Sequence, residues 1–440
     1  MKKARPVVLK FGGDDLEEVG SVVARIAETK RAGPPVVVVV SARRGVTDAL
    51  ESLLSSRVSR GELTAAQQLL ESSYPELANA GRRCLEGLDH LIDIAGKRPL
   101  TLPERHQLLS GGERLSSHWL SSQLMKSGLS ARPVEADRLG LLVETRGGAP
   151  RIALDRCRRV VASRLLAICR RGEVPVVTGF FGRGPGGTPV TLGRGSSDYT
   201  ATAIGAALGA GRVELIKHHA PLMSADPAVV RSSRPIARLS YDEAEALAQM
   251  GARVLHPLSI APARENGIEI RVRSLKEPAQ SSRIGRRGSR RGGKAVALLG
   301  SLEFVPLDIP AARERPHILR GLTEGLSERG VVIQALFTSS EGLFLLLRSR
   351  ELQRGLAALR GAAGSTGASA GTTVPVALVT VIGERVMDDI RFVPKRLLYR
   401  TLAFWSTGCS LSLVVPQPSG RGAATALHRA LIERRSTARR

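Results

Sequence analysis

Residues 36–40 read Val-Val-Val-Val-Val and run into Ser41-Ala42. An unbroken β-branched run of this length is typical of a strand buried on both faces, as in a parallel sheet. Similar short apolar runs lie at 5–11, 174–178, 213–216 and 268–272, and helical patterns lie at 17–31, 155–171, 200–210 and 241–250. Strands that alternate with helices predict an α/β fold with a doubly wound, mostly parallel sheet.

The chain has 440 residues, which indicates two or three domains. Residues 48–130 are mostly helical in pattern and are expected to form a lid-like insertion. Residues 281–293 are rich in Gly, Ser and Arg and are predicted to be a hinge. We therefore expect a first domain at 1–285, a basic linker at 286–294, and two smaller domains at 295–372 and 373–440.

The two smaller domains follow a β-α-β-β pattern, which predicts an α+β, ferredoxin-like fold. In the first, strands are expected at 295–307, 331–336 and 342–347, with a helix at 318–329. The second begins with a strand at 374–383 and closes with a strand at 409–415 and a helix at 423–433. Its middle, 388–406, has only a poor helical pattern, so this unit looks shortened.

The formal net charge is +25, but the arginines are scattered through every segment. The densest basic cluster, 283–294, lacks the interleaved aromatics on which nucleic-acid readers stack bases, so a solvated linker is favoured over a polyanion contact. No apolar run approaches the roughly 18 residues of a membrane span, and no signal-peptide pattern follows Met1. We expect a cytoplasmic protein with no membrane and no nucleic-acid partner. The four cysteines show no metal-ligand spacing.

Two glycine-containing segments follow the first two predicted strands. Lys10-Phe-Gly-Gly13 places an ammonium and backbone N–H groups together, which suits a phosphate group, although Gly-Gly after a strand is more often a turn. The second segment, 41–48, offers Ser41 and Thr47 at the end of a parallel strand, where ligands bind in open sheets. Helix capping by Thr47 is an equally good interpretation.

Two further segments carry candidate ligand-binding side chains. In Gly111-Gly-Glu-Arg-Leu-Ser116, Glu113 is expected at a helix start, either as a cap or as a partner for a substrate ammonium. Thr191-Leu-Gly-Arg-Gly-Ser-Ser-Asp198 is a glycine loop that runs into a helix expected at Thr200, which makes an anion site. Capping explains Ser197 or Asp198, but it does not explain Arg194 between two glycines, whose guanidinium suits a carboxylate.

Taken in order, these motifs resemble those of aspartate kinase, an amino-acid kinase that carries C-terminal paired ACT domains. The resemblance covers residues 5–285 and includes Thr178-Gly-Phe-Phe-Gly182, Leu239-Ser-Tyr-Asp-Glu-Ala244 and Gly251-Ala-Arg-Val-Leu-His-Pro257. It implies the amino-acid kinase fold followed by ferredoxin-like ACT domains. The implied reaction transfers the ATP γ-phosphate to the β-carboxylate of L-aspartate, the first step of the lysine, threonine and methionine pathway.

The resemblance also implies roles for the candidate residues. Lys10 and Asp198 would be catalytic, Lys10 by stabilising charge on the transferring phosphoryl group. Phosphate or ATP would contact Lys10, Gly12, Gly13 and Ser41. Lys217, His218 and Arg253 depart from the family pattern, and they are expected to add positive charge at the phosphates if the chain is a working kinase. Aspartate would contact Thr47, Glu113, Arg194 and Ser197, with Glu113 at its amino group. ATP and Mg²⁺ would be the cofactors, with Mg²⁺ bridging the ATP phosphates and no metal held by the protein alone.

Two segments depart from the family pattern. Asp14-Asp15 stand where the family has Thr-Ser, and carboxylates beside a triphosphate repel it unless a cation intervenes. The stretch Ile216–Ala228 replaces the family's nucleotide segment, with Lys217-His218 for Thr-Asp and Pro221 for a glycine. Arg253 stands for a lysine. The chain is thus either a working aspartate kinase with rebuilt ATP contacts, or a catalytically deficient relative that acts as an amino-acid-binding regulatory subunit.

The expected partners follow from the same resemblance. L-aspartate is the expected substrate, and an amino-acid effector such as lysine or threonine is expected at the ACT domains. Because ACT strands commonly pair between chains, a homodimer or larger homo-oligomer is expected.

Overall fold

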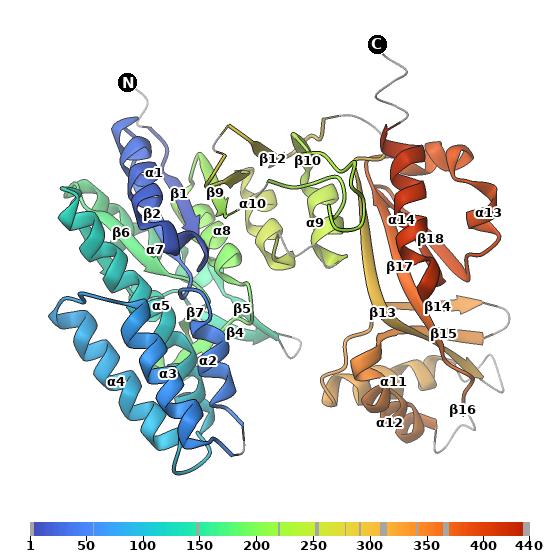
Figure 1. The fold of residues 1–440 in the computed structure, drawn as a ribbon, viewed down its shortest axis with the longest axis horizontal. Coiled ribbons are helices and arrows are strands. Elements are labelled where there is room, and N and C mark those ends of the chain that lie inside the picture. The colour runs from blue at the N-terminus through green and yellow to red at the C-terminus, as the bar shows by residue number, and fades with distance from the viewer. Residues whose placement is uncertain are drawn as a thin grey trace. The chain divides into compact units, whose positions relative to one another are not determined.

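The computed structural model describes residues 4–55, 57–146, 149–218, 221–250, 255–277, 279–289, 292–308, 315–339, 342–363 and 369–433. Its chain divides into two compact units (Figure 1). The first unit comprises 1–222, 235–248 and 253–289, and the second comprises 223–234, 249–252 and 290–440. The segments 223–234 and 249–252, which the sequence pattern places in the first domain, therefore cluster with the second unit.

The described part of the first unit is built on an eight-stranded sheet in the order β10-β12-β11-β9-β1-β2-β6-β3. The pairs are parallel except for β11 with β12, so the prediction of a mostly parallel sheet is confirmed. The strands are β1 (Val7–Phe11), β2 (Val36–Val40), β3 (Ala131–Val134), β6 (Val174–Thr178), β9 (Arg212–Lys217), β10 (Arg238–Ser240), β11 (Glu269–Ser274) and β12 (Ser281–Gly285). Two hairpins accompany them, β4 (Val143–Arg146) with β5 (Ala149–Ile152) and β7 (Phe181–Arg183) with β8 (Pro189–Thr191).

Helices cover both faces of this sheet. The helices α1 and α5 contact each other and β2, whereas α7 and α8 pack together and also contact β2 (Figure 1). The helices are α1 (Val19–Arg31), α2 (Val46–Ser52), α3 (Arg60–Ser73), α4 (Asn79–Ala95), α5 (Leu102–Lys126), α6 (Ala136–Leu139), α7 (Leu154–Arg170), α8 (Ser197–Leu208), α9 (Tyr241–Gln249) and α10 (Ile260–Asn266). This arrangement is the doubly wound fold that the alternating pattern predicts.

Residues 48–130 supply most of α2 and all of α3–α5, and their starts are encoded locally. Capping boxes made by Ser59 with Glu62 and by Thr101 with Glu104 begin α3 and α5. The apolar faces of these helices join β1 and β2 in one buried cluster. This region is therefore an integral part of the core rather than a separate lid.

The described part of the second unit is a seven-stranded antiparallel sheet in the order β14-β15-β13-β17-β19-β18, with β16 paired to β13. Its strands are β13 (Ala295–Asp308), β14 (Ala335–Ser339), β15 (Gly342–Arg348), β16 (Ser369–Ala370), β17 (Val374–Ile382), β18 (Ala403–Thr407) and β19 (Ser410–Pro416). Its helices are α11 (Arg315–Glu328), α12 (Leu352–Ala363), α13 (Lys395–Leu398) and α14 (Gly420–His428).

The long strand β13 joins the two halves of this sheet. Its first part pairs with β17 and its second part pairs with β15, with a register shift between Leu299 and Leu302 (Figure 1). Separate apolar clusters form on either side of this shift, one with β17, β19 and α14 and the other with β15, α11 and α12. The α+β pattern of strands and helices expected after residue 294 is present.

Several predicted boundaries shift by a few residues, and three differences have a local structural basis. Residues 281–285, expected in the hinge, form β12 because Ser282 and Ile284 alternate into the core. The strand expected at 331–336 begins at Ala335, and α8 begins at Ser197 rather than Thr200. In β12 and at the start of α8, tertiary pairing or packing overrides a local composition that is typical of a turn or loop, whereas the apolar run 331–333 lies outside the paired strand β14.

We predict that Leu9→Ala destabilises the first unit. Leu9 is fully buried in the central strand β1, and such a truncation costs about 2–5 kcal/mol. The matched control is Leu102→Ala, because Leu102 is 67% exposed at the start of α5. Thermal and urea unfolding of the full chain will measure both. Equal unfolding midpoints for the two variants would contradict this placement of the core.

Candidate functional site

Lys10 is the fourth of the five residues of β1, and strand periodicity decides which face of the sheet its side chain occupies. Side chains alternate along β1, so Leu9 and Phe11 enter the core shared with α1 and α5, whereas Lys10 faces the other side, where α8 packs. In the neighbouring parallel strand, Leu215 is the register partner of Lys10. Lys217 follows Leu215 by two residues and therefore projects from the same face of the sheet.

The two lysines converge on Asp198 in the first turn of α8. Lys10 Nζ lies 3.2 Å from Asp198 Oδ1, and Lys217 Nζ lies 2.9 Å from Asp198 Oδ2. Lys10 and Asp198 are buried, and the Lys217 side chain is 22% exposed. Burial acts to raise the pKa of Asp198, but the two ammonium groups hold it below its usual value. Burial lowers the pKa of Lys217, although Asp198 opposes this effect. The cluster carries an excess positive charge, which suits an anion.

The Lys-Phe-Gly-Gly segment forms a tight loop against the segment that follows β2. A Cβ atom on Gly13 would lie 2.4 Å from the Ala42 carbonyl oxygen, so only glycine permits this approach. The Gly12 N–H donates a 2.6 Å hydrogen bond to Asp15 Oδ2. Burial raises the pKa of Asp15 to about 6, while this hydrogen bond and the charges of Lys10 and Lys217 act in the opposite direction.

Glu113 is buried in the middle of α5 rather than at a helix start, which corrects the sequence-based expectation. The preceding glycines permit close helix packing: a Cβ atom on Gly112 would lie 2.6 Å from Ala42 Cβ. Glu113 Oε1 accepts a 3.0 Å hydrogen bond from the Ala42 N–H, and Glu113 Oε2 has no hydrogen-bond partner among the described residues. Burial raises the pKa of Glu113 to about 8.

Arg194 lies in a loop whose backbone requires glycine on both sides, with φ of +91° at Gly193 and +76° at Gly195. Its guanidinium is largely exposed and is paired with carboxylates of α2, at 2.7 Å from Asp48 Oδ1 and 2.9 Å from Glu51 Oε2. Arg194 can therefore bind two carboxylate oxygens at once, as the sequence pattern suggests, but here these belong to the protein.

Three of the remaining candidates, Ser41, Thr47 and Ser197, lie at the same edge of the sheet. Ser41 follows β2, and its N–H donates a 3.2 Å hydrogen bond to the Phe11 carbonyl. Thr47 is half-buried in the first turn of α2, and Ser197 is buried at the start of α8. Arg253 lies outside the described residues. The carboxyl ends of β1, β2 and β9 thus bring together most of the candidates.

The acidic segment after the glycine loop is matched by basic groups. Asp14 pairs with Arg44 at 2.5 Å. Glu17 pairs with Arg43 at 2.6 Å, and Glu18 lies 3.7 Å from His218 Nε2 and 3.5 Å from Lys276 Nζ. His218 is therefore oriented toward an acidic side chain of the 3₁₀ helix Asp15–Glu18.

One supporting residue has no signal in the local sequence. The Tyr74 hydroxyl accepts a 3.0 Å hydrogen bond from the Arg43 N–H and donates a 2.9 Å bond to the Gly112 carbonyl. It thereby connects the segment after β2 to the helix that carries Glu113. Tyr74 follows α3 directly, 38 residues before Gly112, so only the tertiary fold places it here.

The cluster does not assemble a metal site from protein side chains. Among the described residues, no group of three or more His, Cys, Asp and Glu side chains could hold a metal ion. Both oxygens of Asp198 face lysine ammonium groups.

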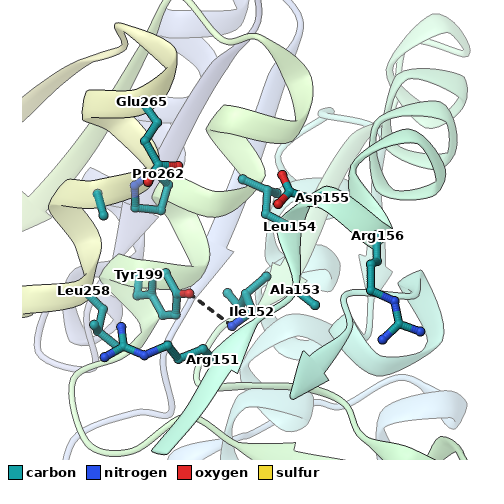
Figure 2. Close-up of a pocket in the computed structure, with 11 residues that line it drawn as sticks. Arg151, Ile152, Ala153, Leu154, Asp155, Arg156, Tyr199, Leu258, Pro262 and Glu265 are labelled. Carbon is teal, nitrogen blue, oxygen red and sulfur yellow. Dashed lines mark hydrogen bonds between the residues drawn. The ribbon is translucent and has the colours of Figure 1, made fainter. Parts of the chain in front are cut away.

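A separate cavity of about 240 Å³ opens in the first unit beside Tyr199 (Figure 2). The Ile152 N–H donates a 3.1 Å hydrogen bond to the Tyr199 hydroxyl, and Arg151 and Glu265 line the same space. Neither Lys10 nor Asp198 lines it.

In the described part of the chain, no helix is long and apolar enough to cross a membrane.

Comparison with known proteins gives one family match and a consistent set of relatives. Residues 5–274 match the model of the amino acid kinase family. The chain is 34% identical over 270 residues to the chloroplastic aspartokinase 3 of Arabidopsis thaliana. This match covers 60% of this chain and 48% of that protein. It is 26% identical over 444 residues to an aspartokinase of Thermus thermophilus, covering 96% of this chain and 98% of that one.

Solved structures share the fold. E. coli aspartokinase III in complex with aspartate and ADP superposes with a TM-score of 0.82 at 23% identity, covering 96% of this chain and 99% of that one. The same enzyme in complex with lysine and aspartate gives a TM-score of 0.76. The chain spans about half to two thirds of the length of the Arabidopsis relatives.

We predict that Glu113→Gln becomes more stable relative to the unmodified chain as pH rises from 5 to 8. Because burial raises the pKa of Glu113 from its usual 4.5 to about 8, the folded state holds a proton that the unfolded state releases. This contribution to stability is complete below pH 4.5 and is lost as pH rises toward 8. Between pH 5 and 8, the difference in unfolding free energy between Glu113→Gln and the unmodified chain should change by roughly 1 kcal/mol per pH unit.

The control for this measurement is Glu104→Gln. Arg98 and the Thr101 N–H lower the pKa of Glu104 to about 2, so its own pH-dependent window lies below 4.5. Its stability difference should therefore stay constant between pH 5 and 8. A Glu113→Gln difference that is equally flat would show that Glu113 is ionised in the folded chain.

Proposed function

Because the chain belongs to the amino acid kinase family, and its relatives are aspartokinases, we propose that it is an aspartate kinase. It transfers the γ-phosphoryl group of ATP to the side-chain carboxylate of L-aspartate and forms 4-phospho-L-aspartate and ADP. The observation that supports this most directly is the convergence of Lys10 and Lys217 on buried Asp198. The two lysines lie toward the carboxyl ends of parallel strands, the usual ligand edge of such sheets.

The proposed reaction needs no proton transfer from the protein. A carboxylate oxygen of aspartate attacks the γ-phosphorus, and the bond from that phosphorus to the β–γ bridging oxygen breaks. The bonding electron pair leaves with ADP. Catalysis therefore depends on positioning and on neutralising the charge of the phosphoryl oxygens. Lys10 and Lys217 supply this positive charge, and Asp198 fixes the direction of both ammonium groups.

The aspartate side of the proposed site uses Glu113 and Arg194. Glu113 Oε2 is buried without a hydrogen-bond partner among the described residues, which suits an incoming ammonium group. An ammonium would favour the ionised form of Glu113 and couple substrate binding to proton release. Arg194 would exchange Asp48 and Glu51 for a carboxylate of the substrate. Thr47 and Ser197 would add hydroxyl donors.

On the nucleotide side, we propose that Gly12, Gly13 and Ser41 line the phosphate-binding loop, with His218 and Arg253 as further basic groups near the phosphates. Mg²⁺ is proposed to enter with the phosphates of ATP, as it commonly does in phosphoryl-transfer sites. The match to the Thermus aspartokinase extends over almost the full length of both chains. E. coli aspartokinase III has been solved in complex with aspartate and ADP, which supports nucleotide use.

The second unit is proposed to be a pair of ACT-like regulatory domains, expected at 295–372 and 373–440, with the first part of β13 packed into the second of them. E. coli aspartokinase III has also been solved in complex with lysine and aspartate, which supports an amino-acid effector. A homodimer or larger homo-oligomer is proposed on the same family grounds. The alternative function, a catalytically deficient regulatory subunit, is favoured by one observation: the Gly12 N–H already binds the carboxylate of Asp15.

The proposed activity is tested by trapping the acyl phosphate. The full chain is mixed with ATP, Mg²⁺ and L-aspartate, and the product is captured as its hydroxamate. We expect product from the unmodified chain and at least a hundredfold loss in Lys10→Ala and Lys217→Ala, because each removes a charge that stabilises the transferred group.

The matched control is Lys126→Ala, since Lys126 is exposed on α5 and pairs with Glu76 at the surface. It should keep full activity. Absence of hydroxamate with the unmodified chain would refute the kinase and favour the regulatory subunit. Full activity in Lys10→Ala would remove Lys10 from the mechanism.

A further inference from the structure

Asp15 places a carboxylate where a phosphate oxygen is expected. Its Oδ2 atom accepts the Gly12 N–H at 2.6 Å, and this N–H belongs to the glycine loop that is proposed to receive phosphate. A Cβ atom built on Gly12 would lie 3.2 Å from Asp15 Oδ2 and 3.5 Å from Lys10 Nζ. The carboxylate and the ammonium group therefore flank the same glycine.

The surroundings of Asp15 are those of a bound anion. The side chain is 1% exposed, and its Oδ1 atom has no hydrogen-bond partner among the described residues. Lys10, Lys217 and His218 all act electrostatically on it. A buried carboxylate with one oxygen unsatisfied is unfavourable unless nearby cations offset the desolvation. The same cations are those that a phosphate group would need.

We propose that the Asp15 carboxylate occupies the position of a donor phosphate group and thereby sets the affinity of the site for nucleotide. This inference rests on the proposed function, since it takes the Gly12 loop to be the phosphate-binding loop. Nucleotide must displace the carboxylate from the Gly12 N–H and bring its own negative charge to the same cations. Asp15 is thus a built-in competitor that weakens nucleotide binding.

A purely structural role makes a different prediction. Asp15 lies three residues after Gly12, and an acidic side chain in this position can cap the start of a helix by accepting such an N–H. In that case its replacement changes the thermal stability of the chain but leaves nucleotide affinity unchanged. The two roles therefore separate when both quantities are measured on the same variants.

The experiment is calorimetric titration of the full chain with MgADP, for the unmodified protein and for Asp15→Asn and Asp15→Ser. Asp15→Asn keeps the shape and one acceptor oxygen, removes the charge and replaces the other oxygen with an NH₂ donor. The matched control is Asp14→Asn, because Asp14 is adjacent in sequence but exposed and paired with Arg44. We expect the Kd for ADP to fall about tenfold or more in both Asp15 variants and to change less than twofold in Asp14→Asn.

Each outcome separates this inference from the proposed function. Equal, measurable affinities in the unmodified chain and Asp15→Asn would overturn the inference and leave the kinase proposal standing, as would a change confined to the unfolding temperature. Binding only in the Asp15 variants would support the inference and refute kinase activity in the natural chain. No ADP binding in any variant would overturn both.

The pH dependence of the affinity ratio provides a second arm. Asp15 faces Lys10 on β1, Lys217 and His218 at the end of β9, and the Gly12 N–H. Because the pKa of Asp15 is raised to about 6, its competing charge is present at pH 8 and largely absent at pH 5. The ratio of Kd values, unmodified over Asp15→Asn, should fall toward one as the pH is lowered over this range, since the ionisation of ADP affects both proteins equally. A constant ratio would count against the inference.

Discussion

The buried carboxylate of Asp198 is the constraint on which the site depends. Two ammonium groups from adjacent parallel strands meet this single carboxylate at 3.2 and 2.9 Å. Without Asp198, the two lysines would be like charges in a poorly solvated space, and breaking a buried ion pair of this kind typically costs about 3–5 kcal/mol. With it, they are held side by side and retain a net positive charge. The fold thus holds the two ammonium groups in place before a ligand arrives, as the proposed phosphoryl transfer requires.

The charge balance around this cluster extends along the chain. The acidic segment 14–18 would repel a triphosphate if it stood alone, but four of its neighbours are basic side chains that pair with it: Arg43, Arg44, His218 and Lys276. Asp15 differs from the other acids because it is buried and turned into the glycine loop. The acids of this segment and the basic side chains around it are therefore parts of one electrostatic arrangement.

Much of the fold could be predicted from the sequence because the first sheet is encoded in local patterns. The valine run of β2 and the alternation of strands with helices are unambiguous, and the family motifs place Lys10 and Asp198 at strand and helix ends. The sequence pattern misplaces Glu113 because Gly-Gly usually signals a turn, whereas here the two glycines lie inside α5 and allow close packing. The role of Tyr74 and the pairing of Arg194 with α2 depend on contacts between distant segments, which no local pattern encodes. The orientation of Asp15 toward Gly12 likewise emerges only in three dimensions.

The most direct test of the proposed site is a crystal structure of the full chain with MgADP and L-aspartate. We predict that the β-phosphate of ADP lies within hydrogen-bond distance of the ammonium groups of Lys10 and Lys217, that Asp198 remains between them, and that the Asp15 carboxylate has left the Gly12 N–H. Aspartate should lie with its ammonium group at Glu113. Nucleotide bound away from both lysines, or phosphate beside an undisplaced Asp15, would contradict this arrangement.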